Sequence, residues 1–140
     1  MSEPQTRFSQ WVKWTERGAL DDIDCPGVYL IAHFDRVPNQ INLQSRRIVY
    51  IGETTGEAGL LSRLNRFNSA SITGRARHSG GRSYHEFFGN EHRDEIYVSI
   101  YPVQNIQRSD VRTSYIKYIE RKLIWEYCKR WHRNPECNTI

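Results

Sequence analysis

Two tyrosines that each stand close to a glycine are the residues of this chain with the clearest capacity for chemistry. Tyr29 ends the segment Gly27-Val28-Tyr29, and Tyr50 begins the segment Tyr50-Ile51-Gly52. A glycine within a strand lets another backbone or a ligand approach closely. Two tyrosines on neighbouring strands, together with a carboxylate such as Glu120, can form a small metal-dependent site that cuts phosphodiester bonds.

Glu120 is the acid with the most unusual surroundings in the sequence. Its neighbours at helical spacing are all apolar: Ile116, Ile119, Leu123 and Ile124. An ionised carboxylate among such side chains is costly unless a partner compensates its charge. Taken alone, this residue favours a salt bridge to an arginine, and a bound metal ion is the alternative.

A long stretch without any acid lies between the tyrosines and Glu120. From Gly59 to Tyr84 there is no Asp or Glu, and the basic side chains of this stretch are Arg63, Arg66, Arg75, Arg77, His78 and Arg82. Arginines gathered without acids are the electrostatic pattern expected of a protein that binds phosphates. A solvated basic loop is the alternative interpretation of the charge alone.

Length and composition predict one soluble globular domain over residues 1–140. Hydrophobic residues make up 38% and charged residues 26% of the 140 positions, and the formal net charge is +4. No apolar run reaches the roughly 18 residues needed to cross a membrane, and the polar N-terminus has no signal region. We therefore expect a cytoplasmic protein with no membrane partner. Its three cysteines show no C-x-x-C spacing, so we expect three reduced thiols.

Hydrophobic periodicity predicts the elements that must hold these residues. Near-helical spacing of apolar residues predicts a helical N-terminal extension over residues 1–20. Apolar runs predict strands over Val28–Phe34, Arg47–Gly52 and Ile96–Val103, the first two joined as an antiparallel hairpin. The expected fold class is α+β, with a small three-stranded antiparallel sheet flanked by helices.

The same patterns predict the helices and the loops around the sheet. A short helix over Leu60–Phe67 is expected to be followed by a polar loop, Ser69–Gly81, and a helical turn, Tyr84–Phe88. A long amphipathic helix is expected to begin near Asp110 as N-cap and to end before Asn134-Pro135. Trp125 and Trp131 in this helix are interpreted as core residues rather than as platforms for stacking bases.

In this order the motifs resemble those of the GIY-YIG endonucleases. Gly27-Val28-Tyr29 and Tyr50-Ile51-Gly52 look like the paired signature of that family, with valine in place of isoleucine. The later segments that resemble the family are Leu61–Phe67 with Arg63, Arg77–Gly81 with His78, Glu120–Ile124, and Asn138 near the end. The resemblance extends over nearly the whole chain, from Gly27 to Asn138.

The resemblance implies a metal-dependent DNA endonuclease that leaves a 5′-phosphate and a 3′-hydroxyl. It implies that Glu120 binds one Mg²⁺ or Mn²⁺ ion, that Arg63 contacts the scissile phosphate, and that Tyr29 acts as general base or orients the water. Tyr50 and His78 would bind phosphate or assist proton transfer, and Asn138 would support the site by hydrogen bonding. Arg66, Arg75, Arg77 and Arg82 are the expected DNA-binding residues.

Several alternatives remain open on the sequence alone. Arg66 competes with Arg63 as the functional arginine, and Asn134 competes with Asn138. The chain could instead be a non-catalytic nucleic-acid-binding module on the same fold, or a structural protein whose basic face binds an acidic partner. The DNA could be double-stranded, branched or single-stranded, and cleavage of both strands would need a homodimer or two visits. Specificity would come from loops or from a separate partner.

Overall fold

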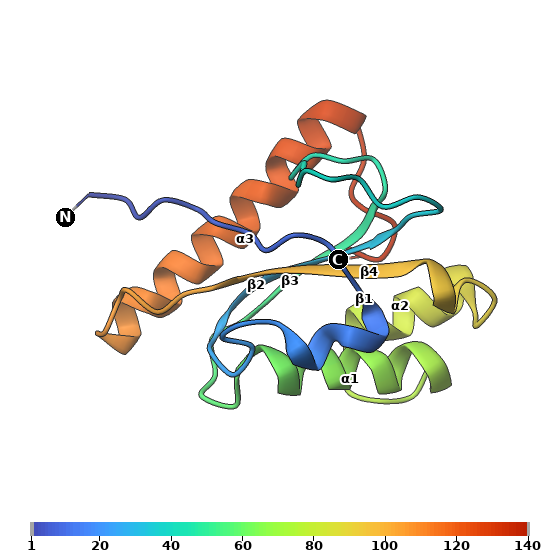
Figure 1. The fold of residues 1–140 in the computed structure, drawn as a ribbon, viewed down its shortest axis with the longest axis horizontal. Helices are drawn as coiled ribbons and strands as arrows, with labels where there is room; N and C mark the ends of the chain where they lie inside the picture. Colours follow the sequence, from blue (N-terminus) through green and yellow to red (C-terminus); the bar gives the residue numbers. More distant parts are fainter. Residues whose placement is uncertain (1, 140) are drawn as a thin grey trace.

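The computed structural model of the chain describes residues 2–139 as an α+β structure with three layers (Figure 1). An antiparallel sheet forms the middle layer, in the order β1-β4-β2-β3. Its strands are β1 (Val12–Lys13), β2 (Gly27–His33), β3 (Ile48–Thr54) and β4 (Ile96–Pro102). Helix α3 (Ser109–Trp131) crosses one face of the sheet, and helices α1 (Gly59–Thr73) and α2 (Ser79–Phe88) cover the other.

Strand β2 separates two hydrophobic cores. Its alternate residues Val28 and Leu30 pack toward α3, whereas Tyr29 and Ile31 pack toward α1 and α2. A strand covered on both faces carries a continuous apolar run instead of an alternating one, as the sequence from Val28 to Ala32 does. The β2 strand is therefore buried on both faces, and it pairs with β3 on one side and β4 on the other.

The predicted antiparallel hairpin is confirmed, and its register decides where the tyrosines point. Tyr29 pairs with Gly52 and Ile31 pairs with Tyr50. Because side chains alternate between the faces of a strand, Tyr29 and Tyr50 share the face that α1 and α2 cover. The sheet places β3 at an edge, so one side of this strand has no strand beside it.

The predictions for the N-terminal region and for the number of strands are wrong. The sheet has a fourth strand, since Val12 and Lys13 pair with Val98 and Tyr97 of β4. The helical part of residues 2–20 is only a 3₁₀ segment, Trp14–Ala19. The near-helical spacing of Trp11 and Trp14 arises instead because one packs into each core. A strand of two residues is too short to show an alternating pattern.

The predicted loop after the first helix is also wrong. Helix α1 continues to Thr73 and ends at Gly74, whose φ of 72° is left-handed, and α2 begins directly after His78. Small residues there mark a close helix contact, because a Cβ on Gly81 would lie 2.6 Å from the Cβ of Ala70 and 2.8 Å from the carbonyl oxygen of Phe67. The small residues that resemble a loop composition allow α1 and α2 to pack closely.

Helix α3 is as long as expected, but two of its residues lie elsewhere than predicted. Arg108, not Asp110, is at the N-cap position, and Asp110 lies in the first turn. Trp131 packs against the core and donates a hydrogen bond from Nε1 to the carbonyl oxygen of Gln44. Trp125 is 61% exposed, so its interpretation as a core residue is wrong.

Among residues 2–139, no helix has the length and apolar character to cross a membrane.

Candidate active site at the edge of strand β3

Tyr29, Tyr50 and His78 form one aromatic cluster under helices α1 and α2. The ring centroids of Tyr29 and Tyr50 are 5.9 Å apart, and that of His78 is 5.6 Å from Tyr50. The hydroxyl of Tyr29 lies 2.8 Å from Nε2 of His78. Tyr29 is fully buried and His78 is 1% exposed, whereas Tyr50 is 9% exposed. Tyr50 is thus the member of the cluster nearest to solvent.

The glycine of the second tyrosine segment makes this cluster possible. A Cβ on Gly52 would lie 2.5 Å from Cζ of Tyr29 and 2.6 Å from Cε2 of Tyr50. At the N-terminus of α2, a Cβ on Gly80 would lie 2.4 Å from Cζ of Tyr50. The tyrosine rings therefore occupy the space where side chains at 52 and 80 would otherwise be.

Replacement of Gly52 by alanine is expected to destabilise the fold and to displace the Tyr29 hydroxyl. The new methyl group would overlap two buried rings, and such overpacking typically costs about 1–3 kcal/mol. The free energy of unfolding, measured by urea denaturation, checks this expectation. Gly56→Ala is the matched control, because a Cβ at 56 meets nothing within 4 Å. Equal stability of the two variants would contradict the packing described here.

The hydrogen bonds of His78 determine which of its nitrogens carries the proton. Its Nδ1 accepts a hydrogen bond from the backbone N–H of Gly81, at 3.1 Å, and so caps α2. The neutral ring must then carry its proton on Nε2. Nε2–H consequently donates to the Tyr29 oxygen, and the proton of Tyr29 is directed away from His78.

Burial keeps His78 neutral and Tyr29 protonated. Burial first, and the positive charge of Arg63 second, lower the pKa of His78 to about 3. Burial raises the pKa of Tyr29 well above its usual value, although the charge of Arg63 opposes this. The pKa of Tyr50 is raised by burial to about 12, again with Arg63 opposing. At neutral pH the cluster consists of two phenols and a neutral imidazole.

We expect stability to fall as the pH decreases from 6.5 toward 4, in part because of His78. The unfolded chain binds a proton at each histidine near pH ~6.5, whereas folded His78 does so only near pH 3. Each histidine whose pKa is lowered by folding reduces the free energy of unfolding by up to about 1.4 kcal/mol for each pH unit below its unfolded pKa. His33, whose pKa burial lowers to about 4, contributes in the same direction.

The variant His78→Asn isolates this contribution, because asparagine can still cap α2 but does not titrate. Chemical denaturation at a series of pH values should give a slope that is shallower by about 1 kcal/mol per pH unit. His132→Asn, at an exposed histidine after α3, is the matched control. An unchanged slope in His78→Asn would contradict the buried, neutral state of His78.

Arg63 is the cation whose charge influences each of the other candidate site residues that titrate. It projects from α1, and its charge acts on the ionisation of Tyr29, Tyr50, His78 and Glu120. Its Nε is buried without a hydrogen-bond partner. The side chain also lines a cavity of about 270 Å³ together with Arg66 and the backbone turn around Gly56. A guanidinium that lines a cavity is suited to bind a phosphate oxygen there.

Glu120 reaches the same strand edge from the opposite layer, on α3. It lines a cavity of about 200 Å³ with Tyr50, Ser79 and Asn138. Burial, followed by the negative charge of Glu53, raises its pKa. The expected arginine partner is weak: Nε of Arg121 lies 3.5 Å from Oε1, and this arginine is 77% exposed. The charges of Arg121, Lys117 and Arg63 all favour the ionised form of Glu120, but burial and Glu53 outweigh them and its pKa remains raised.

Glu53 is a site residue that the sequence analysis missed. It lies on β3 directly after Gly52, and one of its oxygens, Oε2, is buried without a hydrogen-bond partner. Its charge is close enough to raise the pKa of Glu120. Alternation along β3 would have assigned Glu53 to the face of Ile51, but only the position of α3 shows that a second carboxylate lies there.

The side chain of Asn138 forms hydrogen bonds with the unpaired edge of β3. Its Oδ1 accepts a hydrogen bond from the backbone N–H of Ile51, and its Nδ2 donates to the carbonyl oxygen of the same residue, both at 2.9 Å. The backbone N–H of Cys137 donates to the carbonyl oxygen of Val49. Asn134 instead accepts from Sγ of Cys128 at the end of α3. Of the two candidate asparagines, Asn138 is the one that adjoins the cavity of Glu120.

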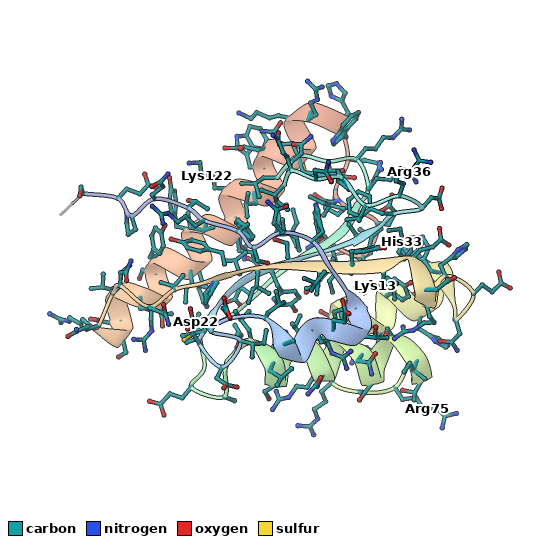
Figure 2. All side chains as sticks on the ribbon, in the orientation of Figure 1. Lys13, Asp22, His33, Arg36, Arg75 and Lys122 are labelled. Atoms are coloured by element: carbon teal, nitrogen blue, oxygen red, sulfur yellow. The ribbon has the colours of Figure 1, made fainter. Side chains whose placement is uncertain are left out.

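The remaining arginines of the acid-free stretch lie at the surface, and two of them are near this site. Arg66, Arg75, Arg77 and Arg82 are all exposed. The charges of Arg66 and Arg82 also lower the pKa of His78, so these two lie near the aromatic cluster. Arg75 projects from the far end of the layer formed by α1 and α2, opposite α3 (Figure 2). Tyr50 and Glu120 thus line one cavity at the edge of β3, whereas Arg63 lines another cavity and acts on both residues through its charge.

No protein-family model, curated protein or solved structure matches this chain. Within residues 2–139, no three His, Cys, Asp or Glu side chains come together as a ready-made metal site. Any assignment of function therefore depends on the residues at the edge of β3 and on their chemistry.

Proposed function

We propose that the protein is a metal-dependent DNA endonuclease of the GIY-YIG type. The observation that carries this proposal is the cavity shared by Tyr50 and Glu120 at the edge of β3, with the charge of Arg63 acting on both residues. Each of the three has the chemistry that phosphodiester hydrolysis requires, namely a cation for the phosphate, a hydroxyl for the water and a carboxylate for a divalent ion. The exposed arginines around the site support binding of a polyanion.

The residues at the strand edge fit one hard divalent cation. Glu120 and Glu53 offer carboxylate oxygens, and one oxygen of Glu53 is buried without a partner. Mg²⁺ commonly binds through only one or two carboxylates and keeps several waters, so a three-residue cluster is not required. Glu120 would hold Mg²⁺ or Mn²⁺, with Glu53 beside it. The bound ion would polarise the phosphate and lower the pKa of its water.

In the proposed reaction, Arg63 holds the scissile phosphate through the guanidinium group that lines the cavity beside Gly56. The oxygen of a water forms a bond to phosphorus while the bond from phosphorus to O3′ breaks. The water gives up a proton, and the departing 3′ oxygen gains one. The products are a 5′-phosphate and a 3′-hydroxyl.

The two tyrosines have different positions and therefore different proposed roles. Tyr50 lines the cavity that also contains Glu120, so its hydroxyl is the one placed to orient the attacking water. Tyr29 is fully buried and receives a hydrogen bond from His78. A donor to the phenol oxygen and the nearby charge of Arg63 oppose the rise in the pKa of Tyr29, but burial outweighs them. We therefore propose that Tyr29 stays protonated and that its ring, 5.9 Å from that of Tyr50, holds Tyr50 in position.

Incubation of the purified protein with supercoiled plasmid tests the proposed activity. Nicked circles should form with Mg²⁺ or Mn²⁺ and should not form with excess chelator. One active site cuts one strand, so nicked circles should precede linear DNA unless the protein is dimeric. Absence of nicking on plasmid, flap and single-stranded substrates would contradict the proposal.

A non-catalytic nucleic-acid-binding module is the second candidate function. The observation that favours it is the complete burial of Tyr29, together with the raised pKa values of Tyr29 and Tyr50. It predicts DNA binding that weakens steeply with salt and no cleavage with either metal ion. The plasmid experiment separates the two candidates directly.

A further inference from the structure

The outer face of α3 carries a second surface that the site at β3 does not use. Between residues 117 and 130, every exposed side chain of this helix is aromatic or basic. The aromatic residues are Tyr118 and Trp125, and the basic ones are Lys117, Arg121, Lys122, Lys129 and Arg130. Lys122 extends from α3 on the side away from the sheet (Figure 2). We call this surface the α3 outer face.

The two aromatic side chains are unusually open to solvent. Tyr118 is 47% and Trp125 is 61% exposed, although each presents a large apolar ring. They are seven residues apart, which is two helical turns and about 10 Å along the axis. They therefore lie on one line along the helix, and the ring of Tyr118 also lies 6.4 Å from that of Tyr115.

A lysine accompanies each of these rings at the same helical spacing. Nζ of Lys122 lies 5.8 Å from the centroid of Tyr118, and Nζ of Lys129 lies 5.6 Å from that of Trp125. The two acids in the same stretch point elsewhere. Glu120 lines the cavity at β3, and Glu126 accepts a hydrogen bond from Gln44. The α3 outer face thus alternates rings with cations and presents no exposed acid.

We propose that the α3 outer face binds a single-stranded nucleic-acid segment, with bases stacked on Tyr118 and Trp125 and phosphates against the lysines and Arg121. Rings for bases beside cations for phosphates are the pattern of single-strand binding surfaces. In a duplex the bases are already stacked and paired, so they cannot use the two rings. A membrane surface fits less well, because membrane-bound helices separate a polar face from a continuous apolar face, whereas the two rings of this face lie among its cations.

Arg121 connects this surface to the candidate active site. It belongs to the α3 outer face, and it also lines the cavity of Glu120. A strand bound along the helix would therefore lead toward Glu120. This last step rests on the proposed nuclease function, whereas binding of the single strand does not.

Fluorescence anisotropy with a labelled twelve-residue oligothymidylate tests the proposal in chelator, where no cleavage can occur. The full-length protein should bind this oligonucleotide more tightly than a blunt duplex of equal length. The double variant Tyr118→Ser/Trp125→Ser should lose at least about tenfold in affinity for the single strand, since each stacked base contributes about 1–3 kcal/mol. Phe87→Ser, at a 56% exposed aromatic residue on α2, is the matched control and should bind normally.

Equal affinity of the double variant and the wild type for the oligonucleotide would overturn the proposal. Binding of the wild type to phosphatidylserine vesicles but not to the oligonucleotide would also overturn it, in favour of a membrane surface. Both variants change exposed side chains, and their circular dichroism spectra should match that of the wild type. Normal oligonucleotide binding without any plasmid nicking would contradict the proposed nuclease function and leave this inference supported.

Discussion

Replacement of Glu120 by glutamine is expected to reduce metal-dependent cleavage by at least about 10³-fold. A divalent ion stabilises the transition state of such reactions by several kcal/mol, and each 1.36 kcal/mol corresponds to a factor of ten in rate. Glutamine keeps the shape of the side chain but removes the charge that holds the ion. Single-turnover cleavage of a labelled DNA substrate at saturating protein gives the rate directly.

The same substitution should not impair folding. Burial and the charge of Glu53 raise the pKa of Glu120, which shows that its ionised form is disfavoured in the ligand-free protein. A neutral amide at this position should therefore give a thermal midpoint equal to or above that of the wild type. Glu126→Gln is the matched control on the same helix, because Glu126 contacts Gln44 and lies outside the site. Comparable cleavage by all three proteins would exclude Glu120 as the metal ligand.

Replacement of Arg63 by alanine has the second largest expected effect, a fall of about 10²–10³-fold in the cleavage rate at saturating substrate. This is the typical effect of removing one preorganised donor that stabilises charge in a transition state. Arg63 has the position for this role, because its charge acts on Tyr29, Tyr50 and Glu120 alike. Loss of its charge should also let the pKa of Tyr50 rise further.

Arg66→Ala distinguishes the two candidate arginines. Arg66 is exposed and lines the same cavity as Arg63, and its charge is a minor cause of the lowered pKa of His78. Its removal should weaken DNA binding and reduce the slope of log affinity against log salt by about one, while the single-turnover rate remains near that of the wild type. A large loss of rate in Arg66→Ala, with Arg63→Ala unaffected, would reverse the assignment.

The parts of the fold that follow from local periodicity could be predicted from the sequence. The β2–β3 hairpin was predicted because two apolar runs are joined by a connection without a helix, and the structure confirms it. Helix α3 was predicted because apolar residues recur every four positions from Val111. The positions of Tyr29 and Tyr50 on one face then follow from strand alternation, once the register is known.

Features that depend on contacts between distant segments could not be predicted in this way. Strand β1 exists because Val12 and Lys13 meet β4, and two residues carry no periodic signal. The second half of α1 has the small, polar composition of a loop, and only the close packing of α1 against Gly81 of α2 explains that composition. Glu53 acts on Glu120 only because α3 is placed across that face of the sheet. The exposure of Trp125 shows that an aromatic residue at helical spacing need not face the core.

The central claim is that Glu120 enables this protein to hydrolyse phosphodiester bonds, and the most direct test combines plasmid nicking with ligation. Wild-type protein and Glu120→Gln, purified in parallel, are incubated with supercoiled plasmid and Mn²⁺, and the products are then treated with DNA ligase. We predict nicks from the wild type alone, sealed by ligase because they carry a 5′-phosphate and a 3′-hydroxyl. Equal nicking by Glu120→Gln, or nicks that ligase cannot seal, would contradict the account.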